Sequence, residues 1–94
     1  MKVLEVAFVE DCLDGTALRD IVLDQAVDSA LIDRLASHGQ LDRYDHFPIP
    51  YFRGTVAAVG VMGTKGSTTF RIVLPARDRD AALHALTRIV EASG

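Results

Sequence analysis

The sequence is poor in the residues that cross-link or stiffen small proteins. It has one cysteine, Cys12, three prolines and no tryptophan among 94 residues. A single cysteine cannot form an intrachain disulfide, so a reducing compartment fits the chain best. No apolar run approaches the roughly eighteen residues of a membrane-spanning helix. These absences argue against a disulfide-rich secreted scaffold and against a helical membrane span.

The first residues also lack the features of a secretory signal peptide. Lys2 and Glu5 interrupt the first apolar run. A signal peptide has a cationic start, an unbroken apolar stretch and a cleavage site of small residues. We therefore expect no signal peptide and a cytoplasmic location.

Excess charge is small overall but unevenly distributed. The net charge of −3 argues against general nucleic-acid binding. Residues 1–47 hold ten acidic and four basic side chains, whereas residues 48–94 hold three acidic and six basic ones. This asymmetry favours an anionic ligand near the basic half or self-association between the halves, although ordinary surface scatter explains it too.

The length and composition fit one folded domain over residues 1–94. Nearly half of the residues are hydrophobic and about a quarter are charged, as in ordinary globular chains. Residues 2–10 predict a strand that is apolar on both sides and therefore central in a sheet. Apolar residues at four-residue spacing predict a helix over 16–38, and residues 40–47 predict a short strand. A second helix is predicted over 79–92, capped by Asp78.

The strongest local pattern is a β-hairpin. Two apolar runs, 55–62 and 68–74, flank a turn with two glycines over 63–67. The first run is apolar on both faces. Because two helices in so small a domain usually cover only one face of a sheet, the second face predicts contact with another copy of the chain.

This order predicts an α+β, ferredoxin-like split βαβ sandwich, an antiparallel sheet with two helices on one face. The segments MKVLEVAFVEDCLDG and FRIVLPARDRDAALHALTRIVEASG resemble the first strand and the last strand and helix of PII-like signalling proteins, including the CutA type. The resemblance implies a ferredoxin-like trimer that senses nucleotides or small metabolites. It places residues 48–66 at the partner-contacting T-loop, and no binding residue is transferred from that family.

Several side chains in the second half are candidates for binding an anion. They are His46, Arg53, Lys65, Ser67 and Arg71. The run Gly63-Thr64-Lys65-Gly66-Ser67 differs from a phosphate-binding P-loop, because Lys-Gly-Ser replaces Gly-Lys-Ser and a strand follows. A plain hairpin tip is the alternative.

The segment 44–53 is the best candidate for a partner surface. It concentrates four aromatic residues near two prolines: Tyr44, Phe47, Tyr51 and Phe52. Aromatic and arginine side chains dominate interface energetics. The alternative is that these rings simply cover one side of the sheet.

The remaining reactive side chains predict no metal or covalent chemistry. His38, His46 and His84 lack metal-ligand spacing, and the acids before Cys12 disfavour a thiolate. Glu5 and Arg71 are expected to form a structural cross-strand ion pair.

Together these features predict a non-enzymatic, oligomeric regulatory module without a cofactor. It would sense a small anionic metabolite or nucleotide and contact a protein partner through residues 44–67. The alternative is a small dimeric α+β enzyme acting on an acidic or aromatic metabolite, with His46 and Arg53 in a cleft.

Overall fold

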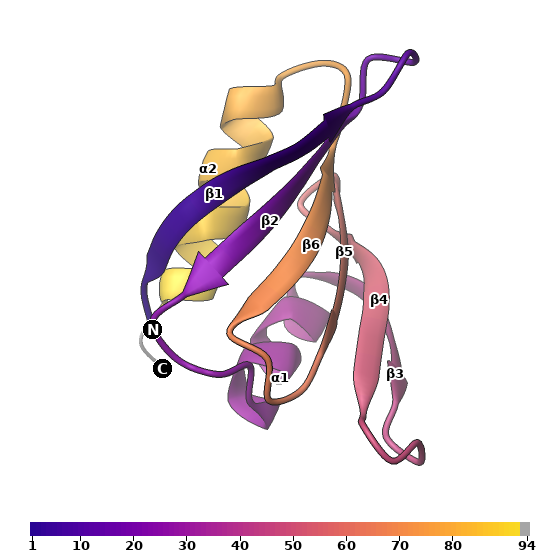
Figure 1. Cartoon of the computed structure of the whole chain (residues 1–94), viewed down its shortest axis with the longest axis vertical. Helices are drawn as coiled ribbons and strands as arrows, with labels where there is room; N and C mark the ends of the chain where they lie inside the picture. The colour runs from indigo at the N-terminus through magenta and orange to yellow at the C-terminus, as the bar shows by residue number, and fades with distance from the viewer. Residues whose placement is uncertain (93–94) are drawn as a thin grey trace.

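The computed structural model describes residues 1–92 and consists of a six-stranded antiparallel sheet and two helices (Figure 1). In chain order the elements are β1 (Val3–Asp11), β2 (Ala17–Leu23), α1 (Ser29–Ser37), β3 (Gly39–Tyr44), β4 (Tyr51–Val56), β5 (Val59–Thr64), β6 (Thr69–Leu74) and α2 (Arg79–Glu91). The strand order in the sheet is β1-β2-β6-β5-β4-β3. The predicted ferredoxin-like sandwich is wrong, because a strand follows β1 where a βαβ unit requires a helix.

The predicted helix over 16–38 is a strand followed by a shorter helix. In β2 the buried residues Ala17, Ile21 and Leu23 face the core, and β2 pairs with both β1 and β6. Helix α1 begins only after Asp28, whose carboxylate accepts the Leu31 N–H at 2.8 Å. The apolar residues that recur every four positions from Leu23 onward therefore begin at the end of β2 and continue into α1.

Asp20, Asp24 and Asp28, which are spaced four residues apart in the predicted helix, have three separate structural roles. Asp20 lies opposite Arg71 in the sheet and forms an ion pair with it. Asp24 accepts the backbone N–H of Lys2 at 2.8 Å, and Asp28 caps α1. None of the three belongs to a solvated helix face.

The apolar run 55–62 contains a chain reversal. Strands β4 and β5 are joined by a tight turn in which Ala57 and Ala58 have φ values of 52° and 67°. The reversal places Val56, Val59 and Val61 on the same buried side. The interpretation of this run as one strand that is apolar on both faces is therefore wrong, and contact with another copy of the chain stays a prediction.

The hairpin formed by β5 and β6 is confirmed, and its turn docks on the segment before α1. Gly66 donates its N–H to the carbonyl of Val27, and Val27 donates its N–H to the carbonyl of Ser67, both at 2.8 Å. Gly66 has a φ of 94°, a conformation that glycine adopts without a Cβ penalty.

Helix α2 agrees with its predicted range to within one residue. Its buried residues, Ala82, Leu86 and Val90, are spaced four residues apart and so lie along one side of the helix. The predicted cap is wrong, since Asp78 has a left-handed φ of 54° and its side chain makes no capping hydrogen bond.

One core joins the sheet to both helices. Helix α1 contacts β3 and β4, α2 contacts β1, β5 and β6, and the helices contact each other. The largest fully buried side chains are Phe52, Phe70, Ile21, Leu31, Leu35, Ile72, Leu74 and Leu86.

Strand β1 is a sheet edge with exposed apolar side chains, so its predicted central position is wrong.

Candidate binding face of the sheet

A row of polar and flexible side chains crosses the sheet on the side away from the core. Cross-strand pairing aligns five residues of β3, β4, β5, β6 and β2, here called the central row: Asp42, Arg53, Met62, Arg71 and Asp20. Their neighbours along the strands, including Phe52, Val61 and Ile72, are buried in the core. Because side chains alternate along a strand, the central row faces outward.

The two arginines of the central row differ in their partners. The guanidinium of Arg71 lies 3.0 Å from Asp20, measured from Nε to Oδ1, and donates a second hydrogen bond from Nη2 at 3.4 Å. These contacts raise the pKa of Arg71 above its usual value. Arg53 lies opposite Asp42 but forms no ion pair within residues 1–92. Arg53 is therefore available to an anionic group from outside.

Two shallow hollows lie on either side of Met62, whose side chain is 47% exposed. One extends toward Asp20 and Arg71, and the other lies between Arg53 and Gly60. Gly60 has no side chain to fill the second hollow. Small-molecule sites usually enclose most of the ligand surface. These open hollows instead suit single side chains of a larger partner.

Aromatic rings extend the outward face at the end of β3 and β4. Tyr44 and Tyr51 lie opposite each other and stack with ring centroids 4.4 Å apart. Phe47 packs on Tyr51 at 5.5 Å, and His46 stacks on Phe47 at 4.9 Å. Three of the four aromatic residues predicted to contact a partner therefore form one cluster beside Arg53.

Other predicted site residues lie elsewhere or are already engaged. Phe52 has no exposed surface and packs against Phe70 in the core, so it cannot contact a partner. The hydroxyl of Ser67 accepts the N–H of Thr69 and donates to the carbonyl of Thr69. The backbone N–H of Lys65 donates to the carbonyl of Pro50, which places the β5–β6 turn beside the aromatic segment.

The predicted ion pair between Glu5 and Arg71 is wrong, because β2 lies between β1 and β6 and supplies Asp20 instead.

His46 lines neither hollow beside Met62, so the structure gives no support to a catalytic cleft around it. Among residues 1–92 there is no group of three His, Cys, Asp or Glu side chains that could hold a metal ion.

Sequence patterns alone do not identify Met62, Asp20 and Asp42 as members of the outward face. Strand alternation finds Met62 only once the chain reversal at Ala57 and Ala58 is known. Asp20 falls within the predicted helix, so its partner in β6 cannot be inferred from the sequence.

Comparison of the chain with protein-family models, curated proteins and solved structures finds no match. The resemblance to PII-like proteins stays untested, while the ferredoxin-like fold that it implied is not the fold observed. Neither helix in residues 1–92 is long and apolar enough to cross a membrane.

Proposed function

We propose that the chain is a non-catalytic binding module that takes up a partner protein on the outward face of its sheet. The observation that carries the proposal is the continuity of the central row with the stacked pair Tyr44–Tyr51. Arginine, methionine and tyrosine are the residues enriched at protein interfaces. An open sheet face that combines them suits a macromolecular partner.

The charges of the face specify the chemistry of the partner. Arg71 is neutralised by Asp20, whereas Arg53 has no ion pair within the described residues. A carboxylate from the partner would pair with Arg53, and an adjacent aliphatic or aromatic side chain would pack on Met62. An acidic residue next to an apolar one is therefore the expected recognition element.

Selection from a random peptide library tests the proposal, because the selection itself reveals which sequences the face binds. We expect enriched peptides to contain an acid beside an apolar residue, and Arg53→Glu to weaken their binding by about tenfold or more. Arg77→Glu, an exposed charge change between β6 and α2, is the matched control.

NMR shift perturbation by a selected peptide locates the site directly. The proposal predicts that the largest changes fall on the central row and on Tyr44 and Tyr51. Perturbations centred on the helices, or equal losses of affinity in Arg53→Glu and Arg77→Glu, would overturn it.

A further inference from the structure

Asp42 is a second charged side chain on the outward face that forms no ion pair within residues 1–92. It lies directly opposite Arg53 in the pairing of β3 with β4, and both side chains are exposed. Both residues line the hollow beside Gly60. The other opposed charges of the central row, Asp20 and Arg71, are joined by two hydrogen bonds. The row therefore contains one closed charge pair and one open charge pair.

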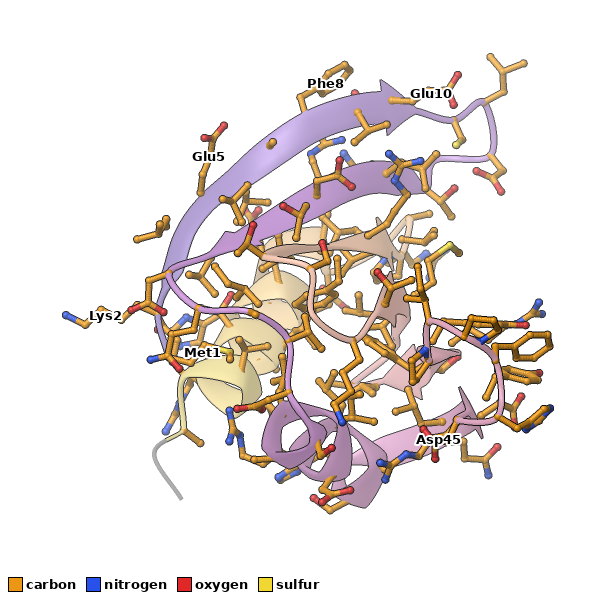
Figure 2. All side chains as sticks on the ribbon, turned by 60° about the horizontal axis from the view of Figure 1, so that its bottom comes forward. Met1, Lys2, Glu5, Phe8, Glu10 and Asp45 are labelled. Atoms are coloured by element: carbon orange, nitrogen blue, oxygen red, sulfur yellow. The ribbon has the colours of Figure 1, made fainter. Side chains whose placement is uncertain are left out.

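The next charged residue of β3 does not neutralise Asp42. Arg43 forms ion pairs with Asp33 and Asp45, and its side chain points to the other side of the strand because side chains alternate. Figure 2 shows Asp45 on the opposite side of the molecule from Glu5 of β1, as expected for the two edges of the sheet. Arg43 is therefore already engaged, and the acidic side chains of β1 belong to the far edge.

A partner that contacts both Met62 and the stacked tyrosines also covers Asp42. Strand pairing places Met62, Arg53 and Asp42 side by side on β5, β4 and β3. Tyr51 and Tyr44 occupy the neighbouring outward positions of β4 and β3. Because Asp42 adjoins Tyr44 on the same face of β3, its carboxylate lies under the same contact.

Covering this part of the face makes its charge balance important. An ion pair in water contributes little, so Asp42 and Arg53 need not close on each other in the free chain. A charge that loses its water without gaining a partner is strongly unfavourable. A guanidinium has five N–H donors and can bridge Asp42 and an incoming carboxylate. Two carboxylates and one guanidinium would still leave one excess negative charge under the partner.

We infer that the partner brings a cation to Asp42 as well as a carboxylate to Arg53. A base, an acid and an apolar side chain of the partner then lie in this order over β3, β4 and β5, the last one on Met62. This partner chemistry rests on the proposed function and narrows it to a protein segment that carries a neighbouring lysine or arginine and aspartate or glutamate. Opposite charges facing each other across an interface fix the orientation of the partner.

Peptide selection against two forms of the full chain tests the order of the charges. Asp42→Arg combined with Arg53→Asp reverses the open pair, keeps the net charge and changes only exposed positions. From one random peptide library, we expect the wild type to enrich peptides in which an acid stands between a base and an apolar residue. The variant should enrich peptides in which a base stands between an acid and an apolar residue. The same order of charges with both forms would overturn the inference.

A double-mutant cycle measures the contact with Asp42 directly. A peptide enriched by the wild type, with acetylated and amidated ends, is compared with the same peptide in which alanine replaces the base. We expect Asp42→Asn to weaken binding of the first peptide by about fivefold or more and to leave binding of the second unchanged. Asp80→Asn, an exposed change on α2, is the matched control and should affect neither peptide.

The same measurements separate this inference from the proposed function. If Asp42→Asn leaves binding unchanged while Arg53→Glu weakens it, the inference is wrong and the proposed function stands. Tighter binding by Asp42→Asn would also overturn the inference, because it would show that Asp42 competes with the partner's acid for Arg53. If neither variant changes the affinity, the outward face is not the binding site and both are wrong.

Discussion

Asp20 and Arg71 lie directly opposite each other on β2 and β6, with Arg71 Nε 3.0 Å from Asp20 Oδ1. The pair joins β2, which the sequence patterns assign to a helix, to β6, which they identify correctly as a strand. It also fixes one arginine of the central row in place beside Met62, which lies opposite Arg71 on β5.

We expect Asp20→Asn to release the Arg71 guanidinium and to lower the Arg71 pKa toward its ordinary value, because Asp20 is the cause of the increase. Faster solvent exchange of the Arg71 Nε–H, measured by NMR, would report the loss of the ion pair. Glu5→Gln is the matched control and should leave that resonance unchanged. A larger effect from Glu5→Gln would contradict the observed strand order.

The β4–β5 turn is expected to be a site of stored strain. Ala57 and Ala58 both adopt left-handed conformations, which cost an L-residue with a Cβ roughly 1–2 kcal/mol each. Ala58→Gly, or Ala57→Asn with Ala58→Gly, should therefore raise the free energy of unfolding by about 1 kcal/mol or more. Denaturant titration measures the change.

The control for the turn is Ala85→Gly, at an exposed position within α2. Glycine in a helix interior should lower the free energy of unfolding by about 1 kcal/mol. Equal destabilisation by Ala58→Gly and Ala85→Gly would show that the turn does not have the left-handed geometry described.

Glycine is required where β3 and β4 approach each other. A Cβ added at Gly54 would overlap the carbonyl oxygen of Gln40 and lie 2.8 Å from the Leu41 Cα. Because backbone atoms form these contacts, the clash cannot be relieved by a side-chain rotation. We expect Gly54→Ala to lower the free energy of unfolding by about 2–3 kcal/mol.

Gly60→Ala is the matched control for Gly54→Ala. A Cβ at Gly60 would meet the Val73 side chain at 3.3 Å, a contact that a small side-chain adjustment can relieve. Comparable unfolding midpoints for the two variants would refute the close approach of β3 and β4.

Asp14, in the turn between β1 and β2, is expected to make the stability of the fold depend on pH in the acid range. The Thr16 hydroxyl and the Thr16 N–H both donate to Asp14, at 2.6 and 3.0 Å, and lower the Asp14 pKa from 3.8. A lowered folded-state pKa means that the carboxylate stabilises the folded state above the unfolded pKa, and that this contribution is lost as the pH falls through the folded pKa.

Thr16→Val removes the hydroxyl but keeps the backbone donor. In an NMR titration we expect the Asp14 pKa to rise part of the way back toward its ordinary value. An unchanged Asp14 titration would show that the hydroxyl hydrogen bond does not form in solution.

The sequence predicts the elements whose patterns are local and unambiguous. Strand β1, the β5–β6 hairpin and α2 are found because alternation, a glycine-rich turn and an amphipathic stripe each point to one structure. The segment from Ala17 to Leu23 is misassigned because Leu23 and Val27 continue the helical spacing of Leu31 and Leu35. Tertiary pairing with β1 and β6 overrides that periodicity.

The rest of the candidate site depends on topology. Alanine is not a turn residue, so the reversal at Ala57 and Ala58 has no sequence signal, and without it Met62 cannot be placed between Arg53 and Arg71. Composition anticipates the aromatic cluster, but only the strand pairing shows that Phe52 is buried while Tyr51 faces outward.

The paired hydrogen bonds between Val27 and the β5–β6 turn tie the start of α1 to a hairpin that lies later in the chain. Helix α1 has nine residues, fewer than the roughly 12–15 that an isolated helix needs in water. The segment before it is held by hydrogen bonds to Gly66 and Ser67. We therefore expect the hairpin to close before α1 is fully formed, so that substitutions in the hairpin have higher φ-values in folding kinetics than substitutions in α1.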